Sequence, residues 1–285
     1  MITGTRYRLT LEINRQAALA RDIERGQTEI STGKRIQAPS DDPVGAARVS
    51  DLARAQANQA AWKGNLDFAA ALSSRADTVI GAVSAGVIRA QELMVAGASD
   101  TLSAGNRATI AIELRAIAEE IEALSQTRDS RGEPLFPDTD PVLIPAGEGV
   151  RIAAVGRRGE VFGNVAAAGG PRDIAAIVSA AADALVEPVP ALRSPAIQAS
   201  IAELAAAQAH VSFVQGEQGA RGTRIDNLLE RIADFSLEMA EERSKIESAD
   251  VVEVVASMQS RQLTLEAAQA AFARINRNTL FDLIR

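Results

Sequence analysis

Residues 43–97 read PVGAARVSDLARAQANQAAWKGNLDFAAALSSRADTVIGAVSAGVIRAQELMVAG, with a proline at the first position and nowhere after it. Because a proline inside a helix costs about 3 kcal/mol, this stretch rich in Ala, Leu and Arg predicts one long helix. At 1.5 Å per residue the helix would run about 80 Å, whereas a compact globule of 285 residues has a radius of gyration of about 19 Å. We therefore expect a mainly α fold, an antiparallel bundle of long helices.

The positions of the prolines extend this prediction to the rest of the chain. Residues 44–133 and 196–285 contain no proline and are typical of long helices. Residues 131–172 instead hold prolines, glycines and short β-like runs, so we expect a small β insertion at one tip of the rod of helices. Its predicted hairpin consists of Val150–Val155, the turn Gly156–Gly159 and Glu160–Phe162.

Apolar residues recur with seven-residue spacing near both chain ends, which is typical of helices that pair. The C-terminal pattern contains a five-residue step at residues 248–250, which predicts a break between two helices. Because terminal residues seldom carry a core pattern, we expect the ends to pair with each other or with neighbouring subunits. The candidate assembly-interface residues are Leu9, Ile13, Gln16, Ile23, Gln27 and Ile30 at the N-terminal end, and Met258, Leu265, Phe272 and Ile275 at the C-terminal end.

Two of these candidates are polar. Gln16 and Gln27 interrupt an otherwise apolar seam. A polar residue in such a seam costs stability and selects one register, because a slipped helix buries an amide without its partner. Our hypothesis is that both glutamines specify the pairing.

At about 150 residues per domain, a chain of 285 residues suggests roughly two domains. The patterns divide it further. We expect an inner assembly domain from residues 1–42 and 248–285, a helical rod from 43–130 and 173–247, and an outer β-rich insertion at 131–172.

The composition excludes several function classes. Aromatic residues make up 3% of the chain, with 1 Trp and 1 Tyr, and there is 1 His. Because the chain has no cysteine, thiol chemistry, disulfides and cysteine zinc sites are excluded. Phosphate-loop and His-Glu-x-x-His motifs are missing as well. We predict no catalytic residues, no cofactor and no metal. The net charge of −7 and a pI near 5.0 argue against nucleic acid as a partner.

No apolar run resembles a Sec signal, and no segment approaches 18 uncharged apolar residues. We therefore predict no membrane insertion and no cleaved signal peptide. An extracellular protein with this sequence would need another export route.

Two adjacent carboxylates precede the long helix, at Asp41 and Asp42. A lone Asp pair supplies too few oxygen ligands for Ca²⁺. Asp42 is a good N-cap and Pro43 suits the first helical position, so we interpret Asp41-Asp42-Pro43 as a helix start and an inter-domain loop.

The remaining conspicuous residues also favour structural roles. His210 lacks partners at metal-ligand spacing, which indicates a residue on a helix face. The glycine-rich run at residues 215–222 lacks the ending of a phosphate loop and favours close helix packing or a local bend. Arg157 and Arg158 lie among equal numbers of acidic and basic residues and predict a solvated turn.

With these elements in place, both chain ends resemble the flagellins and their hook-associated relatives. Ser31–Arg48, STGKRIQAPSDDPVGAAR, is similar to the first signature of the family. Its Pro-Ser-Asp-Asp-Pro form is closest to the members at the hook-filament junction. The C-terminal matches are Ile246–Asp250, Glu253, Gln262, Ala267, Ala268, Gln269, Phe272 and the closing Leu280-Phe281-Asp282, which adds Phe281 to the candidate interface.

The resemblance implies a structural subunit of the bacterial flagellum, extracellular and exported unfolded through the flagellar type III channel. Its expected partners are other copies of itself in a ring or helical array, the neighbouring hook-associated protein, flagellin and an export chaperone. The expected role joins the hook-associated zone to the flagellin filament. Two alternatives stay open: a short flagellin that forms the filament itself, and a flagellin-like surface adhesin that uses the β insertion.

Overall fold

The computed structural model describes residues 2–99, 101–167 and 169–281, with side chains outside residues 2–6 and 275–281. It is mainly helical, which confirms the expected fold class. The chain forms two compact units: unit 1 contains residues 1–57 and 236–285, and unit 2 contains residues 58–235. Two long helices, α2 (Pro43–Gly97) and α6 (Pro190–Glu247), contribute residues to both units.

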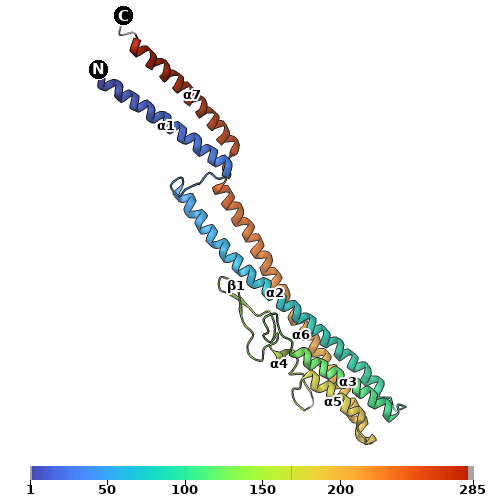
Figure 1. The fold of residues 1–285 in the computed structure, drawn as a ribbon. Coiled ribbons are helices and arrows are strands. Elements are labelled where there is room, and N and C mark those ends of the chain that lie inside the picture. Colours follow the sequence, from blue (N-terminus) through green and yellow to red (C-terminus); the bar gives the residue numbers. More distant parts are fainter. Residues whose placement is uncertain (1, 100, 168, 282–285) are drawn as a thin grey trace. The chain divides into compact units, whose positions relative to one another are not determined.

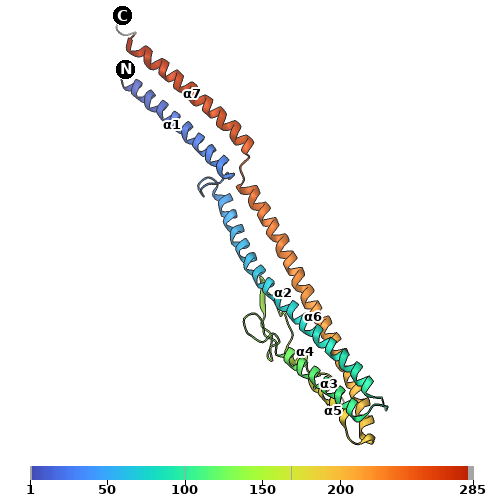
Figure 2. The ribbon, with the colours of Figure 1, turned by 45° about the vertical axis from the view of Figure 1, so that its right-hand side comes forward.

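Unit 1 is built around the two terminal helices, α1 (Ile2–Thr32) and α7 (Val251–Phe281). Figures 1 and 2 both show them side by side. Helix α6 ends at Glu247 and α7 begins at Val251, so the helix break predicted at residues 248–250 is confirmed. The expected division into assembly domain, rod and insertion has different bounds from the two compact units and stays a prediction.

Unit 2 has a continuous hydrophobic core, in which α3 (Ala104–Ser125) and α5 (Ile174–Val186) pack against each other and against α2 and α6. The Ser103 hydroxyl caps α3 by accepting a hydrogen bond from the Asn106 N–H. Burial of a Leu or Ile side chain contributes about 1.5–3 kcal/mol. The largest fully buried side chains include Leu66, Ile80, Met94, Leu114, Ile121, Ile174, Ile177, Leu185, Leu204 and Ile225.

The predicted hairpin of the insertion was wrong in one strand. The observed hairpin pairs β1 (Ile144–Gly147) with β2 (Val150–Ile152) in antiparallel register. Gly149 adopts a φ of 71° in the connecting turn, a conformation that glycine tolerates best. Beyond β2 the chain forms a short helix, α4 (Arg158–Val161), where a second strand was expected. Val161 and its neighbour Phe162 are both buried, which does not fit a hairpin strand with one face in solvent.

The predicted place of the insertion, at a tip of the helices, was also wrong. Within unit 2 it lies against the sides of α2 and α6, as Figure 1 shows. The Asn65 side-chain amide donates to the Pro145 carbonyl oxygen at 2.9 Å, and Arg221 donates to the Val155 carbonyl oxygen at 3.0 Å. These polar contacts to backbone carbonyls fix the insertion along the helices, and a single sequence carries no pattern that signals them.

Among the described residues, α2 is long and apolar enough to cross a membrane by composition alone. A buried helix of a folded unit passes the same test. In α2 the residues Val79, Ile80, Val83 and Val87 belong to the core of unit 2. We therefore interpret α2 as a core helix.

Candidate functional site

The terminal helices α1 and α7 form an antiparallel pair that holds most of the predicted interface residues. Gly26 is the one buried residue among those described in α1. A Cβ atom built on Gly26 would lie 3.7 Å from Met258 Cβ and 3.7 Å from Val254 Cγ1. Nearby, Arg261 of α7 lies 3.8 Å from the Asp22 carboxylate of α1. The backbones therefore approach each other closely where α1 carries its glycine.

The structure places the predicted interface residues in three groups. Three residues of α1 and three of α7 are half-buried on the sides of the helices that pair: Gln16, Ile23, Ile30, Met258, Leu265 and Phe272. Leu9, Ile13 and Gln27 are exposed. The side chains of Ile275 and Phe281 lie outside the described residues. In the single chain α1 contacts α7 at Gly26, whereas the side chain of Gln27 is exposed.

Both terminal helices present apolar side chains to solvent. On α1 the exposed fractions are 71% for Tyr7 and 52% for Ile13, and on α7 they are 81% for Val252 and 68% for Leu263. A folded monomer gains nothing from side chains in this position, whereas a partner helix would bury them. We call this set the outer apolar surface; it consists of Tyr7, Leu9, Leu11, Ile13, Val251, Val252 and Leu263.

The two helix breaks of unit 1 are joined by a short antiparallel bridge, which we call the clasp: residues 33–35 and 247–249. The Arg35 N–H donates to the Glu247 carbonyl oxygen at 2.7 Å, and the Ala249 N–H donates to the Gly33 carbonyl oxygen at 3.0 Å. Lys34 is paired with Ser248 between these two bonds. Gly33 ends α1 in the left-handed region with a φ of 67°.

Side chains reinforce the clasp. The Arg35 guanidinium donates to the Ile246 carbonyl oxygen at 3.2 Å and to Asp42 Oδ2 at 3.0 Å. The Glu247 carboxylate lies 3.4 Å from Lys34 Nζ and accepts from Arg243 at 3.1 Å. Partial burial raises the pKa of Glu247, but the hydrogen bonds and charges of Arg243 and Lys34 outweigh it, so the pKa lies below its ordinary value.

Asp41 and Asp42 order the loop that enters α2. Asp42 Oδ1 accepts from the Gly45 N–H at 2.8 Å, as an N-cap does, and the helix begins at Pro43. This bond and the Arg35 hydrogen bond lower the pKa of Asp42. Asp41 Oδ2 accepts from the N–H groups of Ala38 and Gln37, which lower the pKa of Asp41.

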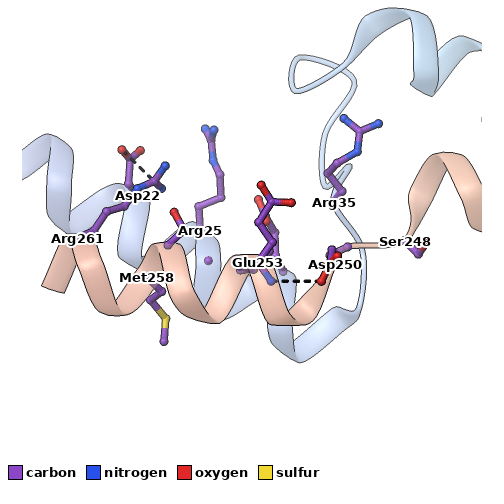
Figure 3. A pocket seen from close by; sticks show the side chains of 13 residues that line it. Asp22, Arg25, Arg35, Ser248, Asp250, Glu253, Met258 and Arg261 are labelled. Atoms are coloured by element: carbon purple, nitrogen blue, oxygen red, sulfur yellow. Dashed lines mark hydrogen bonds and ion pairs between the residues drawn. The ribbon is translucent and has the colours of Figure 1, made fainter.

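A cleft of about 470 Å³ opens beside the clasp, between the end of α1 and the start of α7. Figure 3 shows Arg25, Arg35 and Glu253 around it, with the Asp250 carboxylate capping the first turn of α7. Its walls carry four carboxylates and three guanidinium groups, which is unlike the mostly apolar wall of a small-molecule site. Within the described residues there is no cluster of His, Cys, Asp or Glu that could hold a metal ion.

The other conspicuous residues lie in unit 2. His210 is half-buried on α6, and its Nε2 atom finds no hydrogen-bond partner within the described part of the chain. In the glycine-rich run, Gln218 is buried and donates to Ser73 Oγ at 2.8 Å and to the Ala154 carbonyl oxygen at 3.0 Å. Arg157 forms an ion pair with Asp140, and Arg158 pairs with Asp138 at 2.8 Å.

Sequence reasoning missed four residues that shape these regions: Gly26, Arg35, Glu247 and Gln218. Gly26 is next to Gln27, and Gln27 was predicted as the interface residue because it fits the heptad spacing better. Arg35 and Glu247 lie in the segments that carry the family resemblance, but a pairing between them has no local signal. Only Gln218 could have been found from the sequence, because it is a polar residue at a position where the helical spacing predicts a buried side chain.

Residues 10–140 match the model of the bacterial flagellin N-terminal helical region. The chain is 25% identical over 294 residues to flagellar hook-associated protein 3 of Escherichia coli K12, covering 90% of each protein. It is 25% identical over 289 residues to the protein of that name from Salmonella typhimurium, covering 90% of this chain and 91% of the relative.

Solved structures share the fold. A putative flagellar hook-associated protein from Vibrio parahaemolyticus aligns with a TM-score of 0.66 at 19% identity, over 73% of this chain and 100% of that one. The flagellar junction protein FlgL from Legionella pneumophila aligns with a TM-score of 0.58 at 13% identity, over 70% of this chain and 99% of that one. Together with the sequence matches, these findings confirm the resemblance to flagellins and their hook-associated relatives.

Proposed function

We propose that this flagellin-like chain is a structural subunit of the bacterial flagellum that joins the hook-associated zone to the flagellin filament. The observation that carries the proposal is the similarity to two proteins named flagellar hook-associated protein 3, which extends over 90% of this chain. A match of this extent covers far more of the chain than one shared helical motif.

The physical basis of the proposed role is the outer apolar surface. The terminal pair buries little of its own apolar area: among residues 251–274 of α7, no side chain is fully buried. Ordering a residue costs about 1–2 kcal/mol in backbone entropy, so two helices with such shallow contact gain from a further partner. Copies of this chain around a ring would bury Leu9, Ile13 and Leu263 and would stabilise the terminal helices in the assembly.

The proposed partners are other copies of this chain, the neighbouring hook-associated protein, flagellin and an export chaperone. The proposed location is outside the cell, at the flagellum, after export without a cleaved signal peptide. The proposed role is mechanical, with no catalytic step. This agrees with the structural nature of the family that the chain resembles.

A short flagellin that forms the filament itself is the second candidate, favoured by the match of residues 10–140 to the flagellin helical region. Electron microscopy of the purified chain under conditions that polymerise flagellin distinguishes the two. The junction role predicts short, limited assemblies that seed added flagellin. Long filaments of the chain alone would support the flagellin role instead.

The adhesin alternative rests on the insertion, residues 131–172. Two of its arginines pair with the insertion's own carboxylates, Arg157 with Asp140 and Arg158 with Asp138. These pairs leave less charge for a surface ligand. Loss of motility without loss of adhesion in a deletion strain would favour the junction role over this alternative.

A further inference from the structure

We propose that the clasp and Gly26 together fix the register in which α1 pairs with α7. The pairing itself is a property of the single chain. Its consequence, that the clasp sets the height at which the outer apolar surface meets a neighbour, rests on the proposed function.

The clasp and the helix pair share one register. In the clasp, Lys34 is opposite Ser248. Gly26 lies eight residues before Lys34, and its neighbours Val254 and Met258 lie six and ten residues after Ser248. If the antiparallel pairing continues from the clasp, Gly26 should lie level with the eighth residue after Ser248. That position is midway between Val254 and Met258. The hydrogen bonds of the clasp and the helix contacts therefore specify the same alignment.

Gly26 makes this alignment difficult to change. Sliding α1 by seven residues moves it about 10.5 Å along α7. In one direction the slide brings Leu19 to the place of Gly26, where Met258 Cβ and Val254 Cγ1 already lie 3.7 Å from the position of a Cβ atom. Beyond its Cβ, a leucine would add a branched end that Met258 and Val254 would have to accommodate. In the other direction the slide brings Gly33, where α1 has already ended.

Gln16, a polar residue of the seam, does not select the register of α1 against α7 in the single chain. Gln16 Nε2 is buried without a hydrogen-bond partner among the described residues. Among the described residues, the Gln16 Nε2 group therefore makes no hydrogen bond that would favour the observed register. Steric fit at Gly26, the ion pair of Arg261 with Asp22 and the backbone bonds of the clasp are the features that favour the observed alignment.

Disulfide trapping reads the register directly, because the chain has no cysteine of its own. Three double variants of the full-length chain share Leu19→Cys. The second cysteine replaces Leu265 for the observed alignment, and Met258 or Phe272 for the two slides of seven residues. A disulfide needs a Cα distance of about 4.4–6.8 Å, so a slide of about 10.5 Å changes which pair forms. We expect the Leu265 pair to form and the other two pairs not to form.

Two further changes test the cause. Gly26→Leu, and separately Ala249→Pro, which removes an N–H donor of the clasp, should each reduce the Leu265 cross-link and allow a slipped one. Gly26→Ala and Ala249→Ser are the matched controls and should keep the original pattern, because a Cβ at residue 26 meets only ordinary contacts and serine keeps the donor. If the Leu265 cross-link alone persists at full yield in both test variants, the proposal is wrong.

Gly26→Leu could instead abolish all three cross-links by separating the helices. The exchange Gly26→Met with Met258→Gly addresses this outcome, since it moves the missing side chain to the other helix. Recovery of the Leu265 cross-link in the exchanged chain supports the steric account, and failure to recover contradicts it. A register fixed as described in a chain that does not assemble at the hook would refute the proposed function and leave this inference intact.

Discussion

Arg35 and Glu247 are 212 positions apart in the numbering, yet the N–H of Arg35 donates to the carbonyl oxygen of Glu247 at 2.7 Å. Each residue lies at the break between a terminal helix and a long helix. This bond joins the two breaks. The end of α1 and the start of α7 therefore lie next to each other, and the two helices pair near the clasp. The carboxylate of the same Glu247 also lies 3.4 Å from Lys34 Nζ.

Acid should loosen unit 1 through the carboxylate of Glu247 in the clasp and the carboxylates of Asp41 and Asp42 in the loop that enters α2. The pKa values of Asp41, Asp42 and Glu247 are lower in the folded chain than their ordinary values. The unfolded chain therefore binds protons first as the pH falls, so the stabilisation is complete above the unfolded values of about 4 and is lost as the pH drops through the folded ones. Hydrogen exchange of residues 33–42 between pH 6 and pH 3 measures the loss, and Glu247→Gln should make the exchange less dependent on pH.

Gln218 should be important for holding the insertion on the helices. Gln218→Met keeps the size of the side chain but leaves the Ala154 carbonyl oxygen without its donor, which costs about 1–3 kcal/mol. Urea unfolding followed by the fluorescence of Trp62, the single tryptophan, measures the change. Gln198→Met, at an exposed position of the same helix, should change stability by less than about 0.5 kcal/mol. Equal effects of the two substitutions would show that the buried hydrogen bonds contribute nothing.

A charge in the core and a charge in the terminal seam should have different effects. Ile232 is 7% exposed in unit 2, and Ile232→Asp should lower the stability of that unit by about 3 kcal/mol or more. Phe272 is half-buried on α7 of unit 1, so Phe272→Asp should leave Trp62-detected unfolding nearly unchanged while preventing incorporation at the hook tip. If Phe272→Asp destabilised unit 2 as strongly as Ile232→Asp, α7 would belong to the folded core and the assembly role of the C-terminal end would be wrong.

The outer apolar surface should be required for assembly and not for folding. Ile13→Asp places a charge where a neighbour is expected to bury an apolar side chain, so it should abolish assembly while the helix content of the monomer stays the same. Ile112 of unit 2 is 65% exposed, comparable with 52% for Ile13, and Ile112→Asp serves as the matched control that should assemble normally. Sedimentation velocity measures the assembly of both variants. Normal assembly of the Ile13→Asp chain would remove this surface from the interface.

Local signals predicted much of this fold. The run without proline predicted α2, the five-residue step predicted the end of α6 at Glu247, and Asp42 before Pro43 predicted the start of α2. Each of these features depends on residues within one or two turns of each other, where propensity and capping act.

The errors arose where distant residues decide the structure. The strand that pairs with β2 is β1 and not the segment around Val161. Val161 and Phe162 are both buried in the core of unit 2, and the local sequence does not show this. The contact of Gly26 with Met258 and Val254 depends on a helix far along the chain, so the sequence of α1 alone gives no signal for it. The clasp depends on two breaks meeting in space, which neither segment shows alone.

Electron microscopy of a strain that lacks this chain tests the central claim most directly. The proposed junction role predicts cells with hooks but without filaments, flagellin released into the medium, and recovery of filaments when the unchanged chain, but not the Ile13→Asp chain, is restored. Hooks that carry filaments of normal number and length in the deletion strain would contradict the claim.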